Sequence, residues 1–420
     1  MKIKKIAIIG LGYVGLPLAV ELSKHYKVLG FDINFNRIKK LNSGIDHTNE
    51  VSSKNLKKAI KNGLEITSNK QNLSNYNIFI VTVPTPVTKS NKPDFKPLLD
   101  ACRILGKKIK GGTVIVFEST VYPGATQDIC GKEIEKYSGL QMEQDFFLGY
   151  SPERINPGDK IHTIDKITKV VSAESKYAVN VLKEVYSKLT SGNIFFAKNI
   201  KVAEASKVIE NAQRDINIAF VNEVAKISQK LNISVYDVLD ASLTKWNFLN
   251  FYPGLVGGHC IGVDPFYLAT KAKELGIEPK VILSGRKTND SMGIFVARQI
   301  NKKIQPKSKI LILGITFKEN VPDTRNSKIF DLVNFFKEKK HDVDVCDPHV
   351  SSNDVKKLKL VSMDNLFAHS YDLILLAVSH KEFSVFSQKK VKSLLNENGL
   401  VADIKGLWRK RNTFDRYWSL

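Results

Sequence analysis

The sequence predicts an α/β protein with two Rossmann-like domains, each built on a parallel sheet, joined by a long central helix. Three observations lead to this prediction. Short β-branched runs alternate with helical patterns early in the chain, one long amphipathic stretch follows from Ile200, and the alternation restarts after the segment QPKSK. Alternating strands and helices form parallel sheets flanked by helices, so two series predict two sheets.

The elements follow in order along the chain. The first series comprises KIAIIG, VLGFD, NIFIVTV, TVIVFE and TKVVS. From Ile200 to about Leu231, apolar residues recur three and four positions apart, which predicts one helix able to join two domains and to dimerise. The second series comprises KILILG, DVDVCD, YDLILLAV and LVADIKG, and Asp32 and Asp347 each end the second strand of a series. We expect a Rossmann domain over 1–198, a central helical region over 199–300 and a Rossmann-like domain over 301–420.

The composition excludes several classes of protein. Hydrophobic residues make up 43% and charged residues 25% of the 420 residues, and no stretch reaches the roughly 18 uninterrupted apolar residues of a membrane span. The net charge is +22, yet only ten of the 64 basic residues are arginine, and the basic residues do not cluster as in a nucleic-acid groove. The four cysteines lie far apart without a CxxC pair, so we expect no metal site, no disulfide framework and a reducing cytoplasm.

A glycine motif opens the first helix. Gly10, Gly12 and Gly15 follow a strand at the spacing of dinucleotide-binding turns, where the helix N-terminus attracts a pyrophosphate. Asp32 ends the next strand and is placed to accept hydrogen bonds from both ribose hydroxyls, which favours NAD over NADP. Arg37 leaves NADP open, because an arginine after this strand also suits a 2′-phosphate. With two threonines that follow later strands, the predicted cofactor site comprises Gly10, Gly12, Tyr13, Val14, Gly15, Asp32, Arg37, Thr85 and Thr120.

Chemistry is expected around one cysteine. Cys260 follows the pair Gly257-Gly258 in GLVGGHCIGVDP, and glycines there suggest a backbone that passes near a ligand. A thiol with a pKa of about 8.5 is only partly ionised at neutral pH, so a nucleophilic role requires a nearby cation or helix N-terminus. On the long helix, Lys207 and Asn211 project from one face as a donor pair for an oxyanion. Taken alone, these patterns also fit an ordinary core cysteine and a solvated helix face.

Five segments together resemble the UDP-glucose/GDP-mannose dehydrogenase family. They are GLGYVGLPLA, SPERINPG, AEASKVIENAQRD, GLVGGHCIGVDP and LGITFKENVPDTRNSK, and they occur in the family's order over essentially the whole chain. The chain is most similar to the bacterial UDP-N-acetyl-hexosamine 6-dehydrogenases of capsule and O-antigen synthesis, including the Vi-antigen type. The resemblance implies that the first domain binds NAD, the last binds a UDP-sugar, and the central region forms a homodimer and carries the catalytic cysteine.

The family oxidises the C6 alcohol of the sugar to a carboxylate with two NAD per turnover. The resemblance makes Cys260 the nucleophile that forms a thiohemiacetal and then a thioester, which water hydrolyses. Lys207 and Asn211 would hold the oxyanion and an ordered water, Asp264 would activate water or accept protons, and Thr120 would position the water. Arg325 would reach the NAD. The substrate residues implied in this way are Glu153, Arg154, Lys207, Asn211, Gly257, Phe317 and Lys318.

One departure from the family pattern bears on the sugar. UDP-glucose enzymes carry a second glutamate four residues after the first, whereas here Glu153 is followed at that place by Pro157. Glu153 is therefore carried over as a carboxylate near the thioester, and the second role is not. The departure favours an N-acetylated hexosamine over glucose but does not distinguish the gluco, galacto and manno configurations. We expect GlcNAc or GalNAc, while UDP-glucose, UDP-ManNAc and GDP-mannose remain alternatives.

Two other functions remain open. A single-step dehydrogenase of the 3-hydroxyacid type also uses a glycine fingerprint and a helix with Lys and Asn four apart, but it needs no thiol. A nucleic-acid-binding or NAD-sensing protein, suggested by the charge of +22, would bind polyanions with a steep dependence on salt. We expect neither a nucleic-acid partner nor insertion into a membrane.

Overall fold

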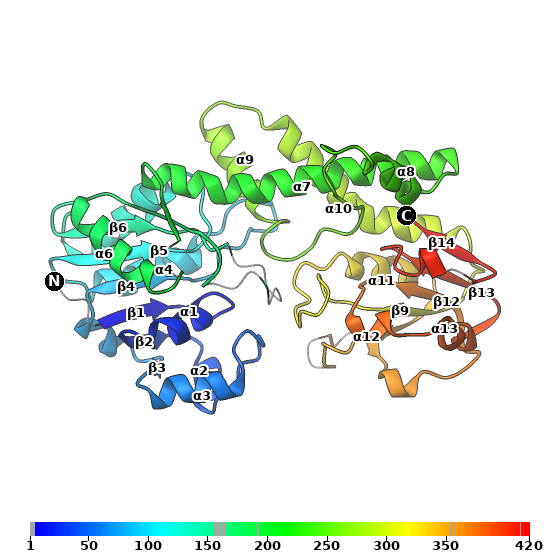
Figure 1. The fold of residues 1–420 in the computed structure, drawn as a ribbon, viewed down its shortest axis with the longest axis horizontal. Coiled ribbons are helices and arrows are strands. Elements are labelled where there is room, and N and C mark those ends of the chain that lie inside the picture. The colour runs from blue at the N-terminus through cyan, green and yellow to red at the C-terminus, as the bar shows by residue number, and fades with distance from the viewer. Residues whose placement is uncertain are drawn as a thin grey trace. The chain divides into compact units, whose positions relative to one another are not determined.

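The computed structural model describes residues 5–154, 161, 165–190, 193–352, 355–356, 358–411 and 413–420. The chain forms two compact units, Met1–Glu210 with Phe266–Glu278 and Asn211–Pro265 with Pro279–Leu420. The segment 199–300, expected as a region of its own, is divided between these units. The long helix α7 (Ile200–Leu231) has the predicted ends. Each unit contains one sheet of the Rossmann type (Figure 1).

The first unit is built on an eight-stranded sheet within its described residues. The strand order is β3-β2-β1-β4-β5-β6-β7-β8, in which β1 lies between β2 and β4 as in dinucleotide-binding folds. The strands are β1 (Lys5–Ile9), β2 (Lys27–Phe31), β3 (Glu65–Thr67), β4 (Ile78–Val81), β5 (Thr113–Phe117), β6 (Phe146–Tyr150), β7 (Lys169–Ala173) and β8 (Ile194–Phe196). The helices are α1 (Gly15–Leu22), α2 (Phe35–Asn42), α3 (Ser53–Lys61), α4 (Lys96–Gly106), α5 (Lys132–Ser138), α6 (Lys176–Ser187) and most of α9 (Asp264–Glu274).

The last two strands of this sheet run against the other six. The six strands β1 to β6 pair with one another only in parallel. Strand β7 instead pairs antiparallel with β6, with Gly149 opposite Ala173 and Tyr150 opposite Ser172. β8 is parallel to β7. The sequence predicts the strand TKVVS correctly, but the expectation that it continues a parallel sheet is wrong, because a local apolar pattern carries no information on strand direction.

Both faces of the first sheet are covered. On one face, side chains of β1, β2, β4 and β5 such as Ile8 and Ile80 pack with α1, α2, α3 and α6. The alternate residues Ala7 and Phe79 point to the opposite face and are also fully buried. Burial on both faces is what parallel sheets require, and it leaves the carboxyl ends of the strands as the open edge for ligands.

The second unit repeats the arrangement of the first six strands. Its sheet has the order β11-β10-β9-β12-β13-β14, with every pair parallel. The strands are β9 (Lys309–Leu313), β10 (Asp342–Cys346), β11 (Lys359–Leu360), β12 (Tyr371–Leu376), β13 (Leu395–Asp403) and β14 (Tyr417–Ser419). The helices are α8 (Val235–Ser242), α10 (Lys280–Asn301), α11 (Ile329–Glu338), α12 (Lys381–Ser384) and α13 (Gln388–Leu394). Among the described residues, no helix combines the length and apolarity needed to span a bilayer.

Candidate active site

The glycine turn after β1 has the geometry of a pyrophosphate cradle. Gly10 adopts a φ of +94°, which L side chains rarely allow. A Cβ on Gly15 would lie 1.9 Å from the carbonyl oxygen of Gly10, so α1 packs on the turn only because this residue is glycine. A Cβ on Gly12 would meet no protein atom within 4 Å, which leaves space beside the backbone for a phosphate group. Tyr13 and Val14 complete the turn before α1.

Two side chains fix the shape of this turn. Asp32, directly after β2, accepts a hydrogen bond from the backbone N–H of Leu11 at 2.9 Å and another from Asn34 at 2.8 Å. Thr82, directly after β4, donates its hydroxyl to the carbonyl oxygen of Gly10 at 2.7 Å. The sequence prediction missed Thr82, although its place at the end of a strand in VTVPTP was visible. The residues thus fit a dinucleotide, with Asp32 at the position expected for the ribose.

Arg37 lies beneath the turn with its guanidinium buried. Its Nε donates to the carbonyl oxygen of Leu11 at 2.8 Å, and its Nη1 forms an ion pair with Asp46 at 2.8 Å. Burial would raise the pKa of Asp46, but hydrogen bonds from Thr48, the N–H of Val51 and Arg37 outweigh it, so the pKa is lowered. The guanidinium is therefore engaged in bracing the turn.

Thr85 and Thr120 follow β4 and β5 at the carboxyl edge of the first sheet, and both are half-buried. Glu153 follows β6 at the same edge and is 7% exposed. Arg154 donates its backbone N–H to the Glu153 carboxylate, while its guanidinium pairs with Glu210 of α7 at 3.0 Å. Parallel strands thus bring these predicted residues to one edge. Pro157, on which the choice of sugar partly depends, lies outside the described residues.

The cysteine segment is tied to α7 through Asp264. The carbonyl oxygen of Cys260 accepts the backbone N–H of Asp264 at 2.8 Å, in the turn that starts α9. The Asp264 carboxylate, 1% exposed, accepts a hydrogen bond from the side-chain amide of Asn211. Cys260 itself is partly exposed, unlike the fully or almost fully buried Cys102, Cys130 and Cys346. Lys207, one turn before Asn211 in α7, is 9% exposed, so neither member of the predicted donor pair belongs to a solvated helix face.

Two glycines let the cysteine segment pack tightly on the loop after β9. A Cβ on Gly257 would lie 2.7 Å from the carbonyl oxygen of Asn326, and one on Gly258 would lie 2.7 Å from the ring of Phe317. Asn326 also donates its amide to the carbonyl oxygen of Gly258 at 3.0 Å. Gly257 and Phe317, both predicted as substrate residues, therefore lie in one place, and Lys318 is the half-buried residue that follows Phe317.

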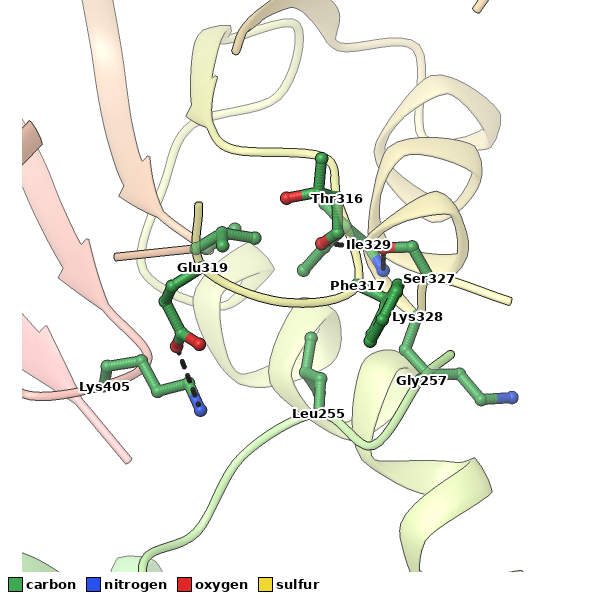
Figure 2. A pocket seen from close by; sticks show the side chains of 11 residues that line it. Leu255, Gly257, Thr316, Phe317, Glu319, Ser327, Lys328, Ile329 and Lys405 are labelled. Carbon is green, nitrogen blue, oxygen red and sulfur yellow. Dashed lines mark hydrogen bonds and ion pairs between the residues drawn. The ribbon is translucent and has the colours of Figure 1, made fainter. Parts of the chain in front are cut away.

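A small cavity of about 40 Å³ opens beside this contact, at the start of α11 (Figure 2). Lys405 lines it and pairs with Glu319 at 3.7 Å, whereas Lys328 lines it but directs its ammonium to Asp290 at 3.0 Å. A lysine near the N-terminus of a helix suits an anionic group. Lys405, which the sequence prediction missed, is one of many lysines and follows β13 without any motif. The cavity is lined by Leu255, Gly257, Thr316, Phe317, Glu319, Ser327, Lys328, Ile329, Ala377, Val378 and Lys405.

Arg325 forms an ion pair with an acidic neighbour. Its guanidinium contacts both carboxylate oxygens of Asp323, with the shortest distance 2.6 Å, and 53% of its side chain is exposed. His259 lies near the same group, with Nδ1 3.7 Å from the Asp323 carboxylate. Burial would raise the pKa of Asp323, but the hydrogen bonds from Arg325 lower it.

The second sheet repeats the turn geometry of the first with different chemistry. Gly314 has a φ of +92°, and Asp347 accepts the N–H of Ile315 at 2.7 Å, as Asp32 does for Leu11. Here, however, the carboxylate is also 3.1 Å from Nε2 of His380 and is 6% exposed. The similarity between the two series of strands is thus confirmed, but the carboxylate of Asp347 is already hydrogen-bonded to groups of the protein.

One histidine-rich group has the composition of a metal site. His349, His380 and Glu382 bring ligand atoms within 4.8 Å of one another among the described residues. Nδ1 of His380 accepts the backbone N–H of Asn320 at 2.9 Å, so the proton of the neutral ring is on Nε2, which donates to Asp347. Both ring nitrogens of His380 are engaged, and the group is better described as a hydrogen-bond network that anchors the loop after β9.

Comparisons with known proteins agree with this geometry. The NAD binding, central and UDP binding domains of the UDP-glucose/GDP-mannose dehydrogenase family match residues 4–190, 201–291 and 311–410. Protein CapL of Staphylococcus aureus is 48% identical over 426 residues, which cover 99% of this chain and 100% of that protein. A UDP-N-acetyl-D-glucosamine 6-dehydrogenase of Pseudomonas aeruginosa is 47% identical, with 97% and 98% covered. The structure of a UDP-D-ManNAc dehydrogenase from Pyrococcus horikoshii aligns with a TM-score of 0.89 at 30% identity, over 99% of this chain and 98% of that one.

Proposed function

We propose a specific reaction for this chain, which belongs to the UDP-glucose/GDP-mannose dehydrogenase family and is an NAD-dependent oxidoreductase of nucleotide sugars. The reaction is the four-electron oxidation of the C6 hydroxyl of a UDP-N-acetyl-hexosamine, GlcNAc or GalNAc, to the uronic acid. The product would serve surface polysaccharide synthesis, as capsule or O-antigen. UDP-N-acetyl-D-glucosamine is the first substrate to test, because the named relative acting on it is 47% identical and the aligned ManNAc enzyme is 30% identical.

The hydrogen-bonded group of Asn211, Asp264 and Cys260 carries the proposal. An amide buried against a carboxylate keeps its second N–H available as a donor, and we assign that donor to the oxyanion of the reacting carbon. Lys207 supplies the positive charge that the same oxyanion and the Cys260 thiolate require. Without a cation or a helix N-terminus, a thiol would remain largely protonated at neutral pH.

The proposed chemistry proceeds on the sulfur of Cys260. The thiolate forms a bond to the aldehyde carbon while the carbonyl electrons move to oxygen, which gives a thiohemiacetal. The same carbon, oxidised once more, remains on Cys260 as a thioester. Water then adds to the thioester and the thiolate leaves, so that a carboxylate is released. Thr120 positions this water, and Asp264 and Glu153 act in their ionised forms as acceptors for its proton.

The glycine turn and Asp32 would hold NAD, which would supply the hydride acceptor for each of the two oxidations. Thr85 and Arg325 are proposed as further contacts to it. The UDP-sugar is proposed to contact Glu153, Arg154, Gly257, Phe317 and Lys318. The cavity beside Phe317 supports an anionic ligand there, because Lys405 and the first turn of α11 line it.

We further propose that the enzyme is a homodimer formed through α7 and that it works in the cytoplasm, where the Cys260 thiol stays reduced. The exposed apolar side chains of α7 support the dimer. Val202, Ile209, Phe220 and Ile227 are 46%, 52%, 62% and 53% exposed. Large apolar residues exposed in a row mark an interaction surface more often than an ordinary helix face.

Counting cofactor per sugar tests the reaction. Purified enzyme is given NAD and, separately, UDP-GlcNAc, UDP-GalNAc, UDP-ManNAc and UDP-glucose, and the NADH formed is divided by the sugar consumed. We expect two NADH per sugar with UDP-GlcNAc or UDP-GalNAc. One NADH per sugar would identify a single-step dehydrogenase, and a ratio of two only with UDP-ManNAc or UDP-glucose would overturn the choice of sugar.

Variants of two cysteines test the thioester. Cys260→Ser should lower steady-state turnover by about 100-fold or more, because serine at neutral pH lacks the ionised nucleophile. Cys102→Ala, which removes a fully buried thiol of α4, is the matched control and should keep two NADH per sugar. A Cys260→Ser enzyme with unchanged turnover would contradict the covalent mechanism.

A further inference from the structure

A buried cation lies behind the carboxyl edge of the first sheet. Lys169, the first residue of β7, is fully buried, and its Nζ is 2.9 Å from Glu118 and 2.9 Å from Glu153. The hydroxyl of Tyr186, from α6, donates to the second oxygen of Glu118. Two carboxylates thus share one ammonium group, away from solvent. The sequence prediction singled out Glu153 but neither Glu118 nor Lys169.

The two glutamates belong to the segments that carry predicted catalytic residues. Glu118 follows β5 directly and lies two residues before Thr120, whereas Glu153 follows β6. The ends of these strands are also joined by the N–H of Ser151, which donates to the carbonyl oxygen of Phe117 at 3.0 Å. Lys169 is therefore the one side chain, among those described, with an ion pair to each segment.

Stability alone does not account for this arrangement. Replacing a buried ion pair by apolar residues of similar size is often neutral or stabilising, because desolvating the charges costs more than their attraction returns. Here a third charge is added, which leaves two carboxylates against one ammonium. Burying these three charges costs free energy of folding. Their position at the edge of the sheet that carries the predicted catalytic residues suggests that they serve the reaction.

The charges compete in a definite way. Burial raises the pKa of Glu118 to about 7, a shift that Lys169 opposes and that the negative charge of Glu153 increases. Burial alone would lower the pKa of Lys169, but the two carboxylates outweigh it and keep this ammonium charged. The other charged group nearby, the guanidinium of Arg154, turns to Glu210. Glu118, Glu153, Lys169 and the neutral Tyr186 are thus the titratable groups that face one another.

We propose that Lys169 is a positioning residue for the reaction: it fixes the Glu153 carboxylate and favours its charged form, while Glu118 competes for the same ammonium. The inference rests on the proposed function, in which ionised Glu153 accepts a proton during thioester hydrolysis. Lys169 acts through Glu153 and is not itself placed at the reacting atoms.

Two substitutions should move the enzyme in opposite directions. Lys169→Met removes the cation shared by both carboxylates, so the acid limb of the kcat/KM profile should move to higher pH by about one unit or more. Glu118→Gln removes the competing negative charge and keeps the shape of the side chain. Glu153 is then the only carboxylate paired with Lys169, so the acid limb should move to lower pH. Lys169→Arg keeps the charge and should remain close to wild type.

The control is a lysine of the same sheet that has no link to the carboxyl edge. Lys27, the first residue of β2, pairs with Glu65 at 3.0 Å, and both side chains are about half exposed. Lys27→Met should leave the pH profile unchanged. If Lys169→Met does not fold, Glu118→Gln and Lys169→Arg still decide the matter, because a purely structural role predicts lower stability with an unmoved acid limb.

Direct titration separates this inference from the proposed function. Carboxyl carbon NMR of glutamate-labelled protein, with Glu153 assigned from Glu153→Gln, reports the ionisation of Glu153 without any substrate. The pKa of Glu153 should fall in Glu118→Gln and rise in Lys169→Met. Shifts in the same direction, or none, overturn the inference whatever the activity. Wild-type protein that oxidises none of the UDP-sugars overturns the proposed function instead.

Discussion

The guanidinium of Arg37 acts as a brace for the glycine turn. It is 6% exposed, its Nε is bonded to the backbone of Leu11, and its Nη1 is paired with Asp46. To bind a 2′-phosphate, this group would have to leave Asp46 as an unpaired buried carboxylate, whose ionised form is held by several hydrogen bonds. The arrangement therefore favours NAD, and we propose that Asp32 decides between the two cofactors.

Substitutions of Arg37 and Asp32 should separate bracing from cofactor choice. We expect wild type to use NAD about 100-fold more efficiently than NADP, a difference of about 2.7 kcal/mol. Asp32→Ser should shrink this ratio, because it removes the charge that repels a 2′-phosphate. Arg37→Met should instead destabilise the protein by about 3–5 kcal/mol, because it leaves the buried Asp46 carboxylate without its ion-pair partner. It should leave the ratio of NAD to NADP efficiency unchanged. Steady-state kinetics with both cofactors and thermal melts measure these effects. A gain of NADP use in Arg37→Met would contradict the bracing role.

At the scale of the element, α7 also holds the segment that leads to Cys260. Asn222 accepts the backbone N–H of Gly254 at 2.8 Å and donates to its carbonyl oxygen at 3.0 Å. The same amide donates to Asn289 of α10 at 2.8 Å, and Asn289 donates to Asp215 at 2.7 Å. Asp215 in turn pairs with Arg286. A chain of buried polar groups thus connects α7 and α10 to the backbone six residues before the cysteine.

Removing one member of this hydrogen-bond network should change the reactivity of Cys260. Asn222→Ala leaves the N–H and C=O of Gly254 without their partner, at a cost of about 1–3 kcal/mol for each buried group. We expect a lower kcat and an altered rate of Cys260 alkylation by iodoacetamide. Gln229→Ala is the matched control, because this amide of α7 donates to Ser419 at 2.8 Å instead of to the cysteine segment. If both variants lose stability and neither changes the alkylation rate, Asn222 has only a structural role.

Elements differ in how far their sequence determines them. The ends of α7 follow from apolar residues at helical spacing without an internal glycine or proline. β6 went unpredicted, because its five residues include Gly149 and its flanks lack a turn motif, and the edge strands β3 and β8 have only three residues each. In the candidate site, motif spacing predicted roles for Asp32 and Cys260. The role proposed for Lys169 could not be predicted, because the sequence contains many lysines and no motif marks this one. Only the antiparallel pairing of β7 with β6 brings it to Glu118 and Glu153.

For the whole molecule, the stripe on α7 is the feature that bears on assembly. At about 100° per residue, Val202, Ile209, Phe220, Ile227 and Leu231 fall within a narrow arc of the helix. All five are between 46% and 62% exposed. A stripe that continues over the length of a 32-residue helix presents the same apolar surface on every copy of the chain. A two-fold axis would bring such a surface against itself, so that one patch would serve both subunits of the proposed dimer.

Charges placed on this stripe should therefore break the dimer. We expect wild type to run as a dimer in light scattering, and Ile209→Glu with Phe220→Glu to run as a monomer, because the substitutions place like charges in a buried interface. Arg214→Glu is the control, since Arg214 is exposed on α7 but lies roughly 100° or more from the stripe. The Arg214→Glu variant should remain a dimer. A wild-type monomer at micromolar concentration, or a dimer that survives both glutamates with its fold intact, would show that the interface lies elsewhere on the chain.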